Sequence, residues 1–158
     1  MNPRALALLI SLGTSAPAVA EECHSVHGTM VEDKVIVGCN EGEAFCYLGK
    51  FEGNQGLRSL THFKADSAAA GPATGSPGFV SYSGPFEYRF DDGVIQSRET
   101  GVTNPRKAAA GGGATAAYQQ ITGGTGAYSK VTGYVFVTGV NLDGHVETAI
   151  DGELCNLH

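Results

Sequence analysis

Apolar and polar residues alternate in the middle of the chain. Even positions hold aromatic residues, namely Tyr82, Phe86, Tyr88 and Phe90. The odd positions between them include Glu87 and Arg89. Successive side chains of a β-strand point to opposite faces, so this pattern predicts a strand with one buried face and one solvated face.

Two Asp-Gly pairs predict tight hairpin turns. Asp92-Gly93 joins the aromatic strand to a returning segment, 94–103, and Asp143-Gly144 joins segments 131–140 and 145–154. Asp-Gly is typical of turns whose residues adopt positive φ. The second half of the chain is therefore expected to form antiparallel hairpins.

Segment 131–140 differs from the other strands because both of its faces are apolar. Val131, Val135 and Val137 share one parity, and Tyr134 and Phe136 share the other. One face can fill a core, and the second then needs a covering loop or another subunit. We therefore expect a homo-oligomer.

Shorter apolar runs predict further strands, at 24–31, 34–39, 45–51, 57–64 and 114–121. Helix signals are almost absent. Eight or nine short strands separated by turn residues indicate an all-β fold, a small antiparallel closed barrel of about eight strands, because closure removes exposed edges. Segments 65–77 and 104–113 are rich in Ala, Gly, Ser and Pro and are expected to be loops at a barrel mouth.

The first twenty residues have the pattern of a secretory signal. Arg4 precedes an apolar run, 5–12, and Ala18-Val19-Ala20 resembles a cleavage site. The run is shorter than the ~20 residues of a membrane-spanning helix. We expect residues 1–20 to be a signal peptide, residues 21–158 to be a single barrel domain, and the protein to be secreted or periplasmic.

The four cysteines predict two disulfides, because an even count is typical of exported proteins. Three pairings are open. We favour Cys39–Cys46, which closes a short loop, and Cys23–Cys155, which ties the chain ends. A metal site that uses His24 and His27 is the alternative, but the cysteine spacing differs from zinc-binding motifs. We predict no metal and no cofactor.

The formal net charge of −6 argues against nucleic acid and anionic membranes as partners, because both require basic surfaces. A glycine-rich run, 121–128, invites comparison with phosphate-binding loops. Such loops precede a helix, whereas a strand pattern follows here. Nucleotide binding is therefore not expected.

The same run carries a family resemblance. Ile121-Thr122-Gly123-Gly124-Thr125-Gly126-Ala127-Tyr128, followed by segment 133–139 (GYVFVTG), resembles a segment of allene oxide cyclase and dirigent proteins. The match is clearest over residues 97–155. It implies an eight-stranded barrel with an apolar cavity, often trimeric, whose members with known roles steer cyclisation or coupling of reactive small molecules without a cofactor.

Glu99 is the candidate catalytic residue. It shares parity with Ile95 and Ser97, so it could point into the barrel, where desolvation would raise its pKa and suit it to acid or base catalysis. The alternative is an exposed Glu99 or one paired with an arginine. Arg98 has the opposite parity and is expected on the surface.

Four tyrosines are candidate ligand-binding residues, because each combines an apolar ring with a polar tip. They are Tyr82, Tyr88, Tyr118 and Tyr134. Ordinary core or interface positions are the alternative. Three functions follow: a barrel that binds a small hydrophobic or aromatic molecule, a cofactor-free isomerase, cyclase or dirigent-like steering protein, or a structural barrel whose interior is filled.

Overall fold

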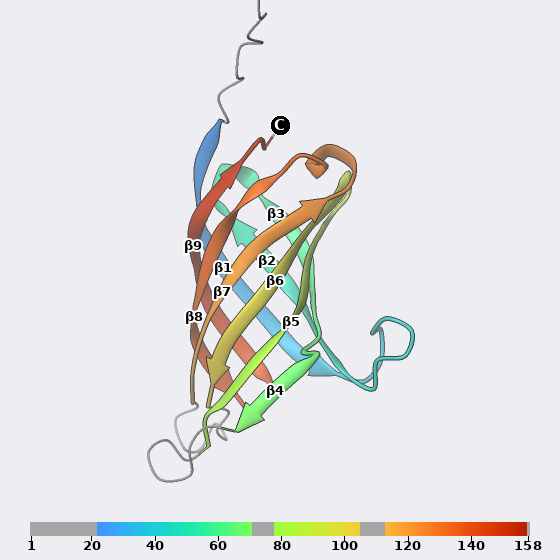
Figure 1. Cartoon of the computed structure of the whole chain (residues 1–158), viewed down its shortest axis with the longest axis vertical. Helices are drawn as coiled ribbons and strands as arrows, with labels where there is room; N and C mark the ends of the chain where they lie inside the picture. The colour runs from blue at the N-terminus through green and yellow to red at the C-terminus, as the bar shows by residue number, and fades with distance from the viewer. Residues whose placement is uncertain (1–21, 71–77, 105–112, 158) are drawn as a thin grey trace, which may run out of the picture.

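The computed structural model describes residues 22–70, 78–104 and 113–157, and these residues form an all-β closed barrel (Figure 1). Two short 3-10 turns, Asn54–Gly56 and Gly126–Tyr128, are the helical elements of this part of the chain. The strands are β1 Cys23–Val35, β2 Cys46–Gly53, β3 Arg58–Phe63, β4 Ser67–Ala70, β5 Val80–Phe90, β6 Gly93–Thr103, β7 Gly113–Gly124, β8 Thr132–Leu142 and β9 His145–Cys155.

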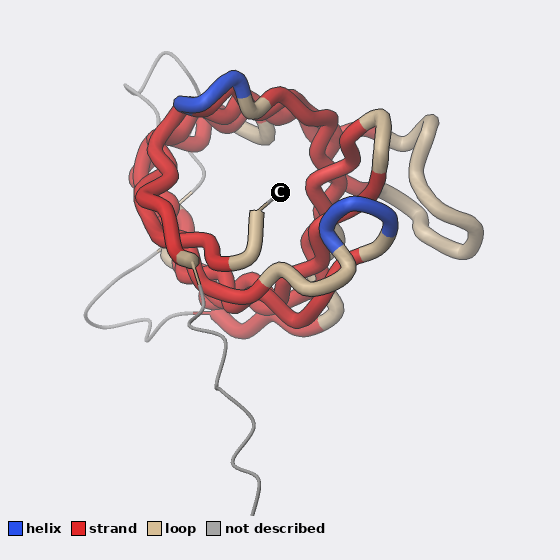
Figure 2. The backbone as a smooth tube through the Cα atoms, turned by 90° about the horizontal axis from the view of Figure 1, so that it is seen from above, coloured by secondary structure: helices blue, strands red, loops and turns tan. Residues whose placement is uncertain are grey.

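The barrel has eight strands and one extra strand, and all pairings are antiparallel. The order is β3-β2-β1-β9-β8-β7-β6-β5, and pairing of β3 with β5 closes the ring seen in Figure 2. The extra strand β4 pairs with residues 80–83 of β5, whereas β3 pairs with residues 86–89. Pro85 lies between these two pairings, where its missing N–H interrupts neither.

The alternation predicted for β5 is confirmed. Phe86 and Tyr88 are buried inside the barrel, and Arg89 pairs with Glu87 on the outside at 2.6 Å. In β8, Val135 and Val137 are buried, whereas Tyr134 and Phe136 are exposed. The barrel interior is therefore the hydrophobic core, and the outer face of β8 is open to solvent.

Some predicted boundaries are wrong. Residues predicted as two strands at 24–31 and 34–39 instead form one long strand, β1, followed by a loop. Part of the predicted loop 65–77 forms β4, because its alanines can pair with the free edge of β5. Residues 71–77 of that loop, residues 105–112 of the second predicted loop and the predicted signal peptide lie outside the described residues.

The two Asp-Gly turns differ. Asp143 and Gly144 have φ of 59° and 103°, as the turn prediction required. At the first hairpin the prediction is wrong: Phe90 pairs with Gly93, so the turn is formed by residues 91–92, and Gly93 does not adopt positive φ. Gly93 is needed for close approach instead, since a Cβ there would lie 2.2 Å from the Thr125 carbonyl oxygen.

Both predicted disulfides are present. Cys23–Cys155 joins paired residues of β1 and β9, and Cys39–Cys46 closes the loop after β1. Disulfides persist in extracellular and other oxidising compartments, with which this pair is consistent. Within the described residues, we find no helix with the length and apolar character to cross a membrane.

Candidate functional site

One end of the barrel interior is hollow. A cavity of about 240 Å³ lies at the end that carries β4, and it is partly open to solvent. Its lining is largely apolar, with rings from β2, β3 and β5, and it includes two carboxyl groups. Its members are Met30, Glu32, Lys34, Phe45, Tyr47, Phe63, Ala65, Ala68, Val80, Tyr82, Glu99, Thr103, Thr115, Val137, Asn141, Val146 and Thr148.

The opposite end is filled. The residual space there is about 10 Å³, and its lining contains no charged side chain: Val26, Phe51, Leu57, Tyr88, Phe90, Ile95, Ile121, Val135, Ile150 and Leu154. Leu157 packs against this core. The C-terminal residues turn inward over this end of the ring (Figure 2). The hollow end is therefore the candidate site.

Glu99 points into the barrel from β6 and is 5% exposed, so the alternative of an exposed or arginine-paired side chain is wrong. Arg98 lies outside and binds Asp66 instead. Gln119 on β7 donates a hydrogen bond to Glu99 at 2.5 Å, and the Tyr82 hydroxyl donates another. Burial raises the pKa of Glu99, and these two hydrogen bonds oppose the rise.

Glu32 is the second carboxyl of the cavity, and the sequence prediction missed it. It comes from β1, is 5% exposed, and accepts a hydrogen bond from the Thr61 hydroxyl at 2.8 Å. Burial, followed by the negative charge of Glu99, raises its pKa to about 8. A signal was present, because Glu32 shares parity with Val26 and Met30. Splitting β1 into two predicted strands, 24–31 and 34–39, left Glu32 between them.

The two carboxyl groups differ in their support. Glu99 accepts hydrogen bonds from two side chains, whereas Glu32 accepts one. Hydrogen bonds to the charged form favour ionisation, so Glu99 loses its proton first. Burial, and secondly the charge of Glu99, then keep Glu32 protonated at neutral pH. The cavity thus holds one carboxyl group, Glu99, that ionises before the other, and one neutral carboxylic acid, Glu32, that can donate a hydrogen bond.

Tyr82 lies in the cavity, with its hydroxyl between Glu99 and Thr115. Its cross-strand partner is Gly101, where a Cβ would lie 2.7 Å from that hydroxyl. Glycine at position 101 therefore makes room for the ring. Burial, followed by the charge of Glu99, raises the pKa of Tyr82, so this hydroxyl remains a donor.

Tyr88 is fully buried in the filled half and does not line the cavity. Its hydroxyl donates to the Gln119 side-chain oxygen at 2.6 Å, and Gln119 in turn donates to Glu99. Burial, followed by the charge of Glu99, raises its pKa. Tyr88 thus lies outside the cavity and supports the site indirectly, because its hydrogen bond fixes the orientation of the Gln119 amide.

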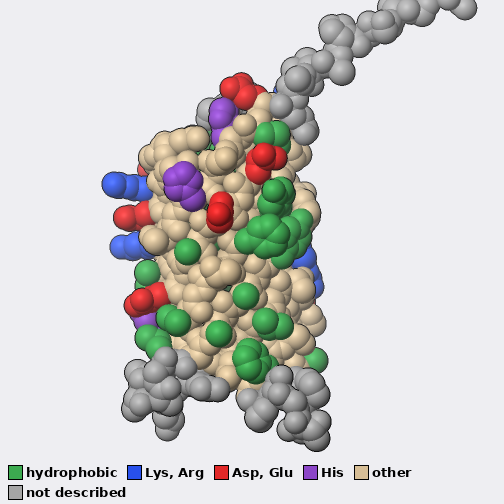
Figure 3. Space-filling view, turned by 90° about the vertical axis from the view of Figure 1, so that its left-hand side faces the viewer, with side chains coloured by type: hydrophobic (Ala, Val, Ile, Leu, Met, Phe, Trp, Pro, Cys, Tyr) green, Lys and Arg blue, Asp and Glu red, His purple; other side chains and the backbone are tan. Residues whose placement is uncertain are grey.

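Tyr118 and Tyr134 are not part of the cavity lining. They lie on the outer wall beside Phe136, with ring centroids 5.4–6.2 Å apart, and each of the three is more than one-third exposed. Their even parity on β7 and β8 directs them outward, since the odd positions face the core. We call these three residues the outer aromatic patch; apolar side chains gather on this wall in Figure 3.

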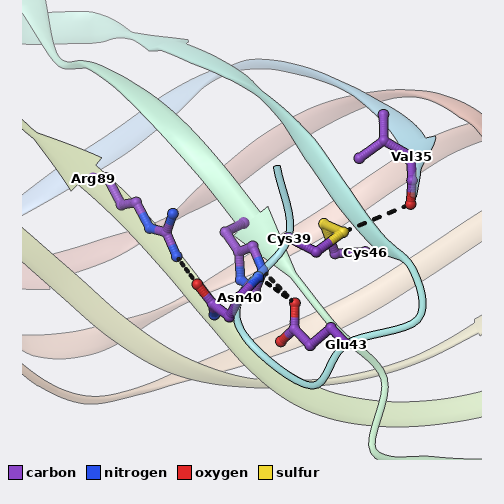
Figure 4. The surroundings of a disulfide bond; sticks show 7 residues. Val35, Cys39, Asn40, Glu43, Cys46 and Arg89 are labelled. Carbon is purple, nitrogen blue, oxygen red and sulfur yellow. Dashed lines mark hydrogen bonds and ion pairs between the residues drawn. A yellow bond between two sulfur atoms is a disulfide. The ribbon is translucent and has the colours of Figure 1, made fainter. Parts of the chain in front are cut away.

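The rim of the cavity is set by the loop between β1 and β2. Phe45 from this loop lines the cavity, and the Lys64 and Lys34 ammonium groups lie 3.4 Å and 4.5 Å from its ring centroid. Two loop residues fix the loop to the outer wall: Glu43 accepts from buried His62 at 2.8 Å, and Asn40 accepts from Arg89 at 3.1 Å (Figure 4).

Two clusters within the described residues have the composition of metal ligands. One combines Cys39 and Cys46 with Glu43, and the other combines Cys23 and Cys155 with Glu153. In both, the sulfur atoms are joined in a disulfide and offer no thiolate. His24 and His27 belong to neither cluster.

Comparison of the chain with protein-family models, with curated proteins and with solved structures found no match.

Proposed function

We propose that this protein is an exported barrel that binds one small, mostly apolar molecule in the cavity at the β4 end. The observation that carries the proposal is the hollow itself: about 240 Å³, with an apolar lining and two buried carboxyl groups. Binding sites are typically apolar pockets in which a few polar groups fix the orientation of the ligand. The volume lies just below the ~300 Å³ at the lower end of common ligand sites, which favours a compact molecule.

Export is supported by two features: the signal-like pattern of residues 1–20 and the two disulfides. The resemblance to allene oxide cyclase and dirigent proteins supports a barrel with a ligand cavity. A purely structural barrel is the competing proposal, and it would leave the two carboxyl groups without a ligand-related role.

The test is a titration of the protein with 2-phenylethanol, a compact neutral probe. Binding is monitored by NMR chemical-shift changes in the protein. We expect shifts in residues of the cavity lining. Val137→Phe fills the cavity and should abolish them, whereas the matched control Thr138→Phe adds the same ring to the outer face of β8 and should not. Undiminished binding by Val137→Phe would overturn the proposal, as would failure of the unmodified protein to bind any compact probe with such an apolar body.

A cofactor-free isomerase or cyclase is the second candidate. It is favoured by two carboxyl groups of unequal acidity in one cavity, because such a pair can supply a general acid and a general base. Glu99 would then be the base and Glu32 the acid. If Glu99→Gln and Glu32→Gln both left turnover of every accepted substrate unchanged, binding alone would remain.

We also propose that the protein self-associates through the outer aromatic patch, so that a second copy covers the exposed outer face of β8. The patch exposes more apolar surface than an isolated strand residue would, and such surfaces mark interaction sites. The family resemblance favours a trimer. Sedimentation of the unmodified protein and of Phe136→Glu tests this, since a monomer in both cases would overturn it.

A further inference from the structure

The charge balance of the cavity is one-sided. Its titratable lining residues are Glu32, Glu99, Lys34, Tyr47 and Tyr82. The two glutamates are buried, whereas Lys34 is exposed and its ammonium group lies over the Phe45 ring at the rim. No described basic side chain is buried in the cavity opposite the carboxyl groups.

The protein also supplies fewer hydrogen-bond donors than the two carboxyl groups can accept. A carboxylate has about four acceptor positions. Thr61 is the one side chain that we find donating to Glu32, and Gln119 and Tyr82 donate to Glu99, among the residues that the structure describes. An ionised Glu32 would therefore need a donor or a positive charge from the ligand.

Aromatic rings complete this environment. Phe45, Tyr47, Phe63 and Tyr82 contribute to the same lining. The face of an aromatic ring attracts a cation, most strongly where water is excluded. Carboxylates and aromatic faces in one cavity form a recognised environment for organic ammonium groups, and the net charge of −6 attracts cations towards the protein.

We propose that the cavity selects a primary amine in its protonated form, with the ammonium group between Glu32 and Glu99 and an apolar body against Phe63 and Tyr82. This inference rests on the proposed function and names the chemical class of its ligand. No covalent bond changes. The ammonium N–H groups donate to both carboxylates, and the proton that Glu32 carried at neutral pH leaves to the solvent.

The inference separates three probes that share a phenyl body: 2-phenylethylammonium, 2-phenylethanol and 3-phenylpropanoate. Calorimetric titration at about pH 7 should give the ammonium compound at least about tenfold tighter binding than the alcohol, and the carboxylate the weakest binding. Repeating the ammonium titration in buffers of different ionisation enthalpy should reveal release of up to one proton. That release should vanish as the pH rises above the pKa of Glu32, about 8.

Glu32→Gln should remove the proton release and weaken ammonium binding at least about tenfold, with little change for the alcohol. Glu52→Gln, which changes an exposed carboxylate on β2, is the matched control and should change neither. If Glu32→Gln fails to fold, the relative affinities of the three probes and the measured proton release of the unmodified protein still test the inference.

Equal or tighter binding of the alcohol, or ammonium binding without proton release, would overturn the inference and leave the proposed apolar binding site standing. Tighter binding of 3-phenylpropanoate would overturn it in the same way. Failure of all three probes to bind would count against the proposed function itself.

Discussion

The two halves of the barrel interior are enclosed by the same strands, but one half is packed with side chains and the other is hollow. Towards the chain ends, aliphatic and aromatic side chains fill the space to within about 10 Å³. Towards β4 the same eight strands enclose about 240 Å³ and two carboxyl groups. An eight-stranded barrel is wide enough either to be filled or to hold one small ligand, and here each half adopts one of these two states.

The boundary between the halves is a polar relay. Tyr88 belongs to the filled half, Glu99 belongs to the cavity, and the Gln119 side chain connects them. Gln119 is completely buried, so its amide needs both partners. The filled half therefore serves as a rigid support that orients one carboxyl of the hollow half. Four predictions test this division, starting with the largest expected effect.

The two disulfides lie at opposite ends of the barrel and should differ in their contribution to stability. Cys23–Cys155 spans 132 residues at the filled end, and Cys39–Cys46 spans 7 at the cavity end. The chain-entropy relation gives about 5 kcal/mol for the first and about 2.5 kcal/mol for the second. Denaturant unfolding of the paired Cys→Ala variants measures both. A larger loss from the short loop would contradict the entropic account.

The cavity should make the protein less stable as the pH rises. The pKa of Glu32 is raised in the folded state, to about 8 from an ordinary value of 4.5, so the folded protein holds this proton more tightly than the unfolded chain. The stabilising contribution is complete below about pH 4.5 and is lost as the pH rises towards 8. We expect the free energy of unfolding to fall by a few kcal/mol across this window.

Glu32→Gln should flatten that decline, because the amide resembles the protonated acid and does not titrate. The difference between the two proteins is the useful quantity. The raised pKa values of Glu99 and of exposed His145 add slopes of the same sign, and both groups are retained in the variant. Thermal unfolding from pH 4 to pH 9 provides the measurement. Parallel curves would refute a buried, protonated Glu32.

Two valines on β8 offer a matched comparison of packing. Val135 faces the filled half and Val137 faces the cavity, and both are at least 96% buried. Val135→Ala opens new empty space and should cost about 2 kcal/mol, whereas Val137→Ala enlarges an existing cavity and should cost about 1 kcal/mol. Chemical denaturation distinguishes them. Equal losses would mean that the hollow half is as tightly packed as the filled half.

Ser59 places an unsatisfied hydroxyl group inside the barrel. It faces inward from β3, pairs across the sheet with Phe51, and its hydroxyl has no hydrogen-bond partner among the described residues. A buried hydroxyl without a partner is destabilising, so Ser59→Ala should raise the free energy of unfolding by up to about 1 kcal/mol. The conservative control Ser59→Thr, which retains the hydroxyl, should not. Destabilisation by alanine would imply that this hydroxyl has a bonded partner.

The sequence predicted the strands of the barrel better than the arrangement of side chains inside it. Strict alternation placed the inward side chains of β5, and parity alone directed Glu99 inward. The prediction missed Glu32 because the charged run Glu32-Asp33-Lys34 interrupts the apolar pattern of β1, so two shorter strands were predicted on either side of residues 32–33. The family resemblance implied a cavity, but its restriction to one half of the barrel could not be predicted, because that depends on how inward side chains from several strands meet across the barrel.

The bond between Cys23 and Cys155 has a mechanical consequence. It joins directly paired residues of β1 and β9, close to both ends of the described chain. A pulling force applied at the two termini would pass through this covalent bond and bypass the hydrogen-bonded ladders of the barrel. Stretched from its ends, the oxidised protein should therefore extend very little before covalent rupture, and the reduced protein should unravel by hundreds of ångströms, at roughly 3.3–3.6 Å per residue released.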